Sequence, residues 1–226
     1  MVSASTKGGY ILTYDYDKWS FIDPKEAQKK LNLPRNPRDY TSIAVTTDDS
    51  NDEIVYASSM GDGVIQYKNG TPVQSYNEKN AFKETAGGYG SGYCYIDGLA
   101  FDKNGNLWMT SSEVNHAVLV LDKAGAWHRL DIEQLRGVYT INDILITSTN
   151  DKWIYVPRNT PKLVMIPNSE SLDEVSSYEF TTLIDTDGKE LTPSNYTCVA
   201  EDKDGYIWVG TNRGAVYFTK PRNLFR

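Results

Sequence analysis

The chain has 226 residues, a formal net charge of −7 and 23% charged residues. This length suits one domain or one large piece of a bigger domain. The negative charge argues against nucleic-acid binding, which needs clustered Lys and Arg. No apolar run reaches the roughly 18 residues of a membrane helix, so we expect no direct membrane insertion. Residues 1–20 lack a basic stretch followed by an apolar one, so no signal peptide is expected there.

The N-terminal segment predicts two strands and one helix. Gly9–Thr13 and Lys18–Phe21 have the pattern of the third and fourth strands of a partial four-stranded unit. The helix is expected at Asp23–Asn32, where Asp23 can cap the helix and Pro24 suits its first position. A smaller turn is expected at Glu133–Val138, in another connection.

The rest of the chain repeats with a period of about 50 residues. DKNGNLWMTS at Asp102–Ser111 and DKDGYIWVGT at Asp202–Thr211 share Asp, Lys, Gly and Trp. TNDKWIYVPR at Thr149–Arg158 is a degenerate copy, which lacks the Gly but keeps Trp153. A further copy lies upstream, where Tyr56 takes the Trp place. The spacing between these aromatic residues indicates one supersecondary unit that occurs four times.

Each repeat has the same internal order of short strands. An apolar strand leads into a tight D-x-D/N-G turn, and a second strand with aromatic and β-branched residues follows. A corner of small residues, a third strand and an outer strand, best seen at Ala126–Leu130, complete the unit. Four antiparallel strands in about 50 residues describe a propeller blade.

The predicted fold class is therefore all-β, a β-propeller segment of about four to five four-stranded blades. The expected blades are residues 1–23 (partial), 42–77, 95–132, 140–182 and 192–226 (partial). The predicted strands outnumber the sixteen of a closed four-bladed ring, and an open arc leaves edges bare. We therefore expect a segment of a larger propeller, and a self-closed ring of four or five blades is the alternative.

The residues that recur in the repeats are expected to be structural. Asp and Gly make the turn, and the aromatic side chain fills the space between neighbouring blades. These residues are Asp102, Gly105, Trp108, Trp153, Asp202, Gly205, Trp208 and Gly210.

One segment is not explained by blade building. Residues 87–95 carry four glycines and three tyrosines, and they join an outer strand to the next inner strand. Such connections surround the central channel, where we hypothesise a rim that contacts a glycan fragment or a protein partner. An ordinary flexible connection is the alternative. The candidate binding residues are Tyr89, Tyr93, Tyr95, Asp97, Asn142 and Tyr196.

The sequence offers little for catalysis or metal binding. The D-K-D-G and D-T-D-G strings at Asp202–Gly205 and Asp185–Gly188 do not complete a calcium loop, so hairpin turns are expected. His116 and His128 are expected away from the innermost strands. Cys94 and Cys198 are expected to be two buried free thiols, because a disulfide between them would have to cross the channel. We predict no catalytic residue, metal or cofactor.

Two strings carry a resemblance to a known family. DGLAFDKNGNLWMTS and AEDKDGYIWVGTNRGAVYF resemble the two-component-regulator propeller repeat, found in the periplasmic sensor halves of hybrid kinases of Bacteroidetes. The run from Asp185 to Phe225 is also similar to propellers of the Por (type IX) secretion system.

The resemblance implies a non-enzymatic, ligand- or partner-binding propeller in the periplasm or cell envelope. It would be the extracytoplasmic sensor part of a two-component system and part of a longer parent chain. A docking propeller of the secretion type is the alternative. A propeller lyase or lactonase is a third, less favoured one.

Overall fold

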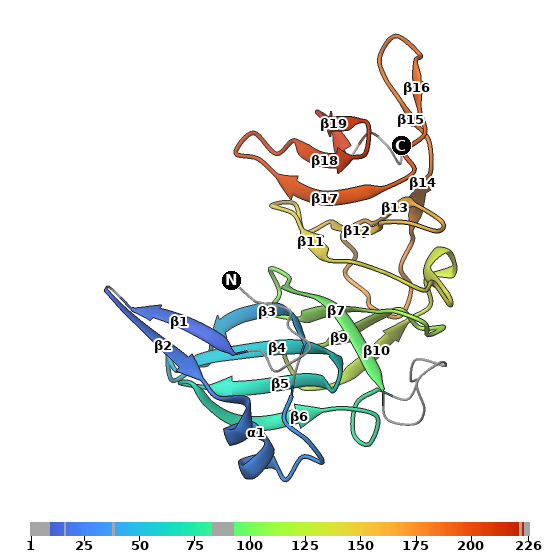
Figure 1. Ribbon diagram of the computed structural model, residues 1–226. Coiled ribbons are helices and arrows are strands. Elements are labelled where there is room, and N and C mark those ends of the chain that lie inside the picture. Colours follow the sequence, from blue (N-terminus) through green and yellow to red (C-terminus); the bar gives the residue numbers. More distant parts are fainter. Residues whose placement is uncertain (1–9, 16, 38, 83–92, 222, 224–226) are drawn as a thin grey trace.

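The computed structural model describes residues 10–15, 17–37, 39–82, 93–221 and 223. These residues form nineteen strands, one α-helix and one 3₁₀ helix, so the chain is mostly β. Figure 1 shows the sheets following one another in chain order, from the blue and cyan strands β3–β6 to the red strands β17–β19 at the opposite end.

The N-terminal part consists of a hairpin and the helix. Strands β1 (Ile11–Asp15) and β2 (Lys18–Ile22) pair with each other. Helix α1 (Pro24–Leu31) begins and ends as predicted: Asp23 accepts a hydrogen bond from the Lys25 amide, and Asn32 takes the left-handed conformation at the other end.

The next strands form antiparallel sheets of consecutive strands. The first comprises β3 (Tyr40–Thr47), β4 (Glu53–Gly61), β5 (Gly63–Lys68) and β6 (Thr71–Tyr76). The second comprises β7 (Cys94–Phe101), β8 (Leu107–Ser111), β9 (Val118–Leu121) and β10 (Trp127–Leu130). Met60 and Gly61 of β4 pair with the start of β7, so these two sheets share one hydrogen-bonded ladder.

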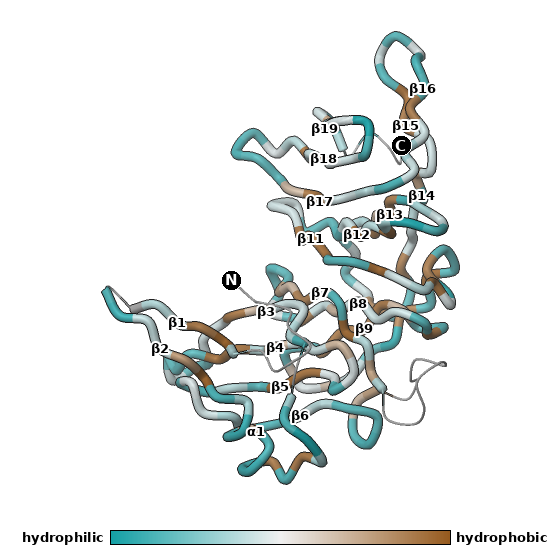
Figure 2. The backbone as a smooth tube through the Cα atoms, in the orientation of Figure 1, coloured by the Kyte–Doolittle hydropathy of each residue, from teal (hydrophilic) through white to brown (hydrophobic). Residues whose placement is uncertain are grey.

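The C-terminal half continues the same order. The 3₁₀ helix Glu133–Leu135 precedes a sheet of β11 (Ile144–Ile146), β12 (Lys152–Val156), β13 (Lys162–Ile166) and β14 (Tyr178–Phe180). A small hairpin of β15 (Leu183–Ile184) and β16 (Glu190–Leu191) follows, which has no counterpart among the predicted strands. The last sheet contains β17 (Tyr196–Glu201), β18 (Ile207–Thr211) and β19 (Gly214–Phe218). Figure 2 shows hydrophilic residues at exposed turns such as the tip of the β15–β16 hairpin.

One turn geometry occurs six times in the described residues. The first residue's amide bonds to the carbonyl of the fifth residue, and the fourth residue's amide bonds to the carbonyl of the first. The fourth residue has a positive φ between 63° and 88°, which Gly and Asn tolerate best. The first and fourth residues are Asp48 and Asn51, Asp102 and Gly105, Asp122 and Gly125, Thr147 and Asn150, Asp185 and Gly188, and Asp202 and Gly205. The two predicted hairpin turns are among them.

The same turn explains the divergent repeat that lacks glycine. Asn150 supplies the positive φ there, at 68°. The Thr147 hydroxyl accepts the Asp151 amide at 3.0 Å, as the Asp102 carboxylate accepts the Asn106 amide at 2.9 Å in the copy that keeps the motif. The turn is retained because either Asp or Thr can accept the amide of the fifth residue, and either Gly or Asn can adopt the positive φ of the fourth.

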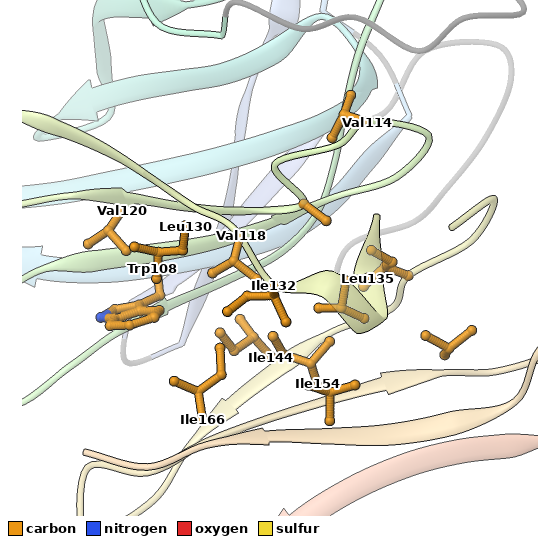
Figure 3. Packing of buried hydrophobic residues seen from close by; sticks show 14 residues of the cluster. Trp108, Val114, Val118, Val120, Leu130, Ile132, Leu135, Ile144, Ile154 and Ile166 are labelled. Atoms are coloured by element: carbon orange, nitrogen blue, oxygen red, sulfur yellow. The ribbon is translucent and has the colours of Figure 1, made fainter. Parts of the chain in front are cut away.

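Sheets between two neighbours are buried on both faces. In β8, Leu107 and Met109 pack with the preceding sheet, whereas Trp108 lies beside Ile144 and Ile166 of the following one (Figure 3). In β12 all five residues are buried. Each hydrophobic cluster lies between two successive parts of the chain, so the core is divided into layers rather than gathered in one place.

Side-chain hydroxyls connect each of the first three sheets to the next inner strand. Ser58, Thr110 and Tyr155 stand at the same position, two residues after the repeated aromatic residue. The Thr110 hydroxyl donates to the Asn142 carbonyl at 2.9 Å, and the Tyr155 hydroxyl donates to the Thr197 carbonyl at 3.1 Å. In the first sheet, Ser58 contacts the Thr41 hydroxyl at 2.8 Å, and Thr41 donates to the Ile96 carbonyl at 2.6 Å.

Thr110→Val should lower the free energy of unfolding by about 1–3 kcal/mol, because the buried Thr110 hydroxyl also accepts the Gly98 amide and valine leaves that group unpaired. Urea denaturation measures this loss. Thr181→Val, at an exposed position, is the matched control and should change stability by less than about 0.5 kcal/mol. Equal stability of the two variants would contradict the assigned role.

Candidate functional site

The repeated Asp and Trp residues make a structural contact. The Trp108 indole N–H donates to the Asp102 carboxylate at 2.9 Å, and Trp208 donates to Asp202 at 2.7 Å. Trp108 is fully buried, and the Lys152 ammonium lies 4.3 Å from its ring centroid. Burial lowers the pKa of Lys152, which the nearby Asp102 carboxylate partly offsets.

The other recurring residues also have geometric roles. Gly105 and Gly205 provide the positive φ of their turns. A Cβ on Gly210 would lie 2.4 Å from the Thr197 hydroxyl, so glycine permits the close approach of β17. Trp153 is buried against the last sheet, whereas Trp208 is 41% exposed, although the sequence predicted that it fills a space between blades.

Asp97 lies on inner strand β7 in a partly enclosed polar site. Its carboxylate accepts the Ser112 hydroxyl at 2.7 Å, and Ser112 in turn accepts the Ile141 amide at 2.8 Å from the next inner segment. Burial raises the pKa of Asp97 to about 7, although the bonds from Ser112 act in the opposite direction. Burial also raises the pKa of Asp143. Two carboxyl groups with reduced acidity therefore lie along successive inner segments.

Of the other predicted rim residues, Asn142 joins this polar row and Tyr196 does not. The Asn142 side-chain amide donates to the Tyr155 hydroxyl at 3.1 Å, which connects it to Thr197. Tyr196 is fully buried, and its hydroxyl donates to the Phe180 carbonyl at 3.3 Å. The structure therefore places Tyr196 in the core between the last two sheets rather than on a rim.

Tyr93 lines a small cavity beside the start of β7. The Arg35 guanidinium lies 5.0 Å from the centroid of its ring, and Arg35 Nε is 2.6 Å from Asp62 Oδ1. Tyr95 packs edge-on against Tyr93 with ring centroids 6.2 Å apart. Tyr89 lies outside the described residues. The cavity, of about 170 Å³, is lined by Leu33, Pro34, Arg35, Asp62, Asn77, Glu78, Lys79 and Tyr93.

The sequence did not point to the charged residues of this cavity. Arg35 lies in the connection after α1, and Asp62 lies in the tight turn between β4 and β5. They meet Tyr93 only because β4 pairs with β7 at this end of the sheets. The one feature of the sequence that could have pointed to this cavity was Asp62 in the G-D-G turn, and an Asp in that position is also typical of an ordinary turn.

The remaining nucleophilic and titratable groups lie elsewhere. His128 is on outer strand β10, where its Nε2 is 2.9 Å from Asp122. Cys94 is buried, and burial raises the pKa of its thiol to about 12. Cys198 is exposed, which corrects the expectation of two buried thiols: its face of the last sheet is uncovered by any described residue. Across the described ranges, no three His, Cys, Asp or Glu side chains are grouped as a metal site.

Asp97→Asn should reduce the pH dependence of stability. Because the pKa of Asp97 is raised in the folded state, its contribution is full below about pH 4 and is lost as the pH rises through about 7. The wild-type protein should lose up to about 4 kcal/mol of stability through this group between pH 4 and 8, and the variant should lose less. Thermal unfolding at several pH values measures the difference. Asp187→Asn, at an exposed turn, is the control, and identical pH profiles for Asp97→Asn and wild type would refute this account.

The comparisons with known proteins agree with the repeat. Residues 190–213, which include β16, β17 and β18, match the family described as two component regulator propeller. This confirms the predicted resemblance for that segment. No curated protein sequence matches the chain significantly. In the part of the chain that the structure describes, no helix is long and apolar enough to cross a membrane.

Solved structures of three kinds share the fold. PorZ, a bacterial surface component of the type-IX secretion system of Porphyromonas gingivalis, superposes with a TM-score of 0.84 at 19% identity, over 96% of this chain and 30% of PorZ. The extracellular domain of a B. thetaiotaomicron protein described as a hybrid two component system gives 0.59 at 17% identity, over 98% of this chain and 27% of the other. A catalytically inactive His-to-Ala variant of virginiamycin B lyase from Staphylococcus aureus gives 0.58 at 15% identity, over 97% and 69%.

These similarities show the fold of the chain and how much of each longer protein it covers. At identities below 20% they show a mostly β, propeller-like fold. The chain spans about 30% of the length of the first of these proteins and 27% of the second. It therefore corresponds to part of those longer chains.

Proposed function

We propose that this chain is a segment of a larger, non-enzymatic propeller that binds a ligand or a protein partner outside the cytoplasm. The segment would contribute about four to five four-stranded blades, some of them partial. The observation that carries the proposal is the superposition over 96% of this chain and only 30% of a surface protein. The repeated turns and the layered core support the same reading.

The cavity at Tyr93 is the binding site that the described residues support best. Donors at Arg35 and Lys79 stand beside acceptors at Asp62 and Glu78, against one aromatic wall. Its volume of about 170 Å³ is below the roughly 300–1,000 Å³ of sites for drug-sized ligands, so it suits one sugar ring or one side chain of a partner. A glycan fragment or a protein partner fits this chemistry.

A sensor role is supported by the family match at residues 190–213. In that role the propeller would belong to a two-component system, and ligand binding would shift the equilibrium between two arrangements of the whole protein. The ligand would have to bind two arrangements of the protein with different affinities, since equal affinity shifts no equilibrium.

A docking role at the cell surface, of the type-IX secretion kind, is the second candidate. It is favoured by one observation, the TM-score of 0.84 with PorZ against 0.59 with the two-component domain. Both roles place the chain in the periplasm or cell envelope.

We also propose that the chain has no catalytic activity. In the related lyase structure, a His-to-Ala change accompanies loss of catalysis. Here Asp97 is bonded to Ser112, and His128 is bonded to Asp122 on an outer strand. Among the described residues, Asp97 and Asp143 are carboxyl groups with raised pKa values, and the Ser112 hydroxyl bonded to Asp97 also accepts the Ile141 amide, which favours a structural role for this pair over a catalytic one.

The complete reading frame separates the two roles. We expect it to encode further propeller repeats on at least one side of these residues. A membrane helix and a kinase in the same frame would establish the sensor role and exclude the docking role. Further blades without a membrane helix or kinase would do the reverse.

Binding at the cavity predicts the effect of two substitutions. Tyr93→Ala and Lys79→Ala should each weaken binding at least tenfold to the glycan or peptide that the protein from the complete frame selects on an array. Tyr139→Ala, at an exposed tyrosine elsewhere, is the control. Unchanged affinity in the folded Tyr93→Ala protein would place the binding site outside this cavity.

A further inference from the structure

The last sheet has two chemically similar faces, and the described residues cover only one of them. Cross-strand pairing places Val199, Ile207 and Val209 on the face that packs onto the preceding sheet. The opposite face, here called the β17–β19 outer face, consists of Cys198, Ala200, Trp208, Ala215 and Tyr217. All five residues are exposed, and Trp208 and Tyr217 are 41% and 54% exposed. An antiparallel sheet facing water normally has polar residues there.

This outer face has the composition of the interfaces inside the molecule. Trp208 occupies the repeat position of Trp108 and Trp153, and each of those is 1% exposed beneath the next sheet. The Trp208 indole is held by Asp202 at 2.7 Å and stacks on Tyr217 with centroids 4.7 Å apart. The aromatic surface is therefore already ordered for packing.

The first hairpin has a second face of the same kind, whose aromatic side chains the described residues leave exposed. Tyr10, Leu12, Tyr14, Trp19 and Phe21 form the β1–β2 outer face, while Ile11 and Ile22 pack toward the neighbouring sheet. The four aromatic residues of this face are between 47% and 64% exposed. Tyr14 and Trp19 lie across the strands with ring centroids 4.8 Å apart.

We propose that both outer faces are packing surfaces for further blades of the same longer polypeptide. The occupant is an antiparallel sheet that places branched aliphatic side chains over Trp208, as Ile144 and Ile166 lie beside Trp108 (Figure 3). Two arguments select this occupant: the outer faces continue the face pattern of the interior interfaces, and the chain spans only about 30% of PorZ. The inference rests on the proposal that the chain is a propeller segment, and it adds which residues receive the missing blades.

Alkylation of Cys198 tests the inference, because this thiol lies on the β17–β19 outer face. The protein expressed from the complete reading frame is treated with N-ethylmaleimide, and labelled peptides are followed by mass spectrometry. Cys198 should react at least tenfold more slowly than in the urea-unfolded protein. Trp208→Glu should restore fast labelling of Cys198 while buried Cys94 stays slow, which shows that the protein remains folded. Val73→Glu, at a residue 43% exposed on β6 of another sheet, is the control and should change neither rate.

Three results would overturn the inference. Labelling of Cys198 in the native wild-type protein at the unfolded rate would show that the face is bare. Protection that disappears on dilution would identify a second copy of the chain as the occupant. Protection that persists in a folded Trp208→Glu protein would place the cover elsewhere. None of these depends on finding a kinase or an enzymatic activity, so the inference and the proposed function can fail separately.

Discussion

The structure depends on one constraint: a sheet between two others must be apolar on both faces. Strand β12 meets it most fully, with Ile154 and Val156 facing one neighbour and Trp153 and Tyr155 facing the other. Most buried polar groups then lie in turns or are hydroxyls that reach a backbone partner, and the buried Lys152 of β12 lies against the Trp108 ring instead. The tight turns follow from the same constraint, because a change of turn length would move each side chain to the wrong face.

The repeat was visible in the sequence because its chemistry is demanding. A turn with a positive φ at its fourth residue accepts few residue types, and a large aromatic side chain is needed to fill the gap between sheets. Asp202, Gly205 and Trp208 therefore recur recognisably. Where Thr147 and Asn150 replace Asp and Gly, the turn motif is lost from the sequence and only Trp153 marks the repeat, although the turn geometry remains. The helix at Pro24–Leu31 was predictable for a similar reason, since its cap and its proline are local features.

The parts that escaped prediction depend on contacts between distant segments. Lys152 is a surface residue by type, yet it is buried against Trp108 of another sheet. The grouping of Arg35, Asp62 and Tyr93 requires three connections to meet at one end of the sheets. Tyr196 was assigned to the wrong environment because strand spacing does not reveal which end of an inner strand enters the core. Such placements follow from the packing of whole sheets and leave no local pattern.

The layered core has a consequence for how the chain acquires its structure. Each hydrophobic cluster draws on two successive parts of the chain, so most tertiary contacts close loops of about one repeat rather than joining the ends. Folding in such an array can begin at any adjacent pair and spread in both directions, with no single obligatory nucleus. A polypeptide of this design can therefore fold sheet by sheet while it is being synthesised or translocated, since each new sheet needs only the preceding sheet to pack against.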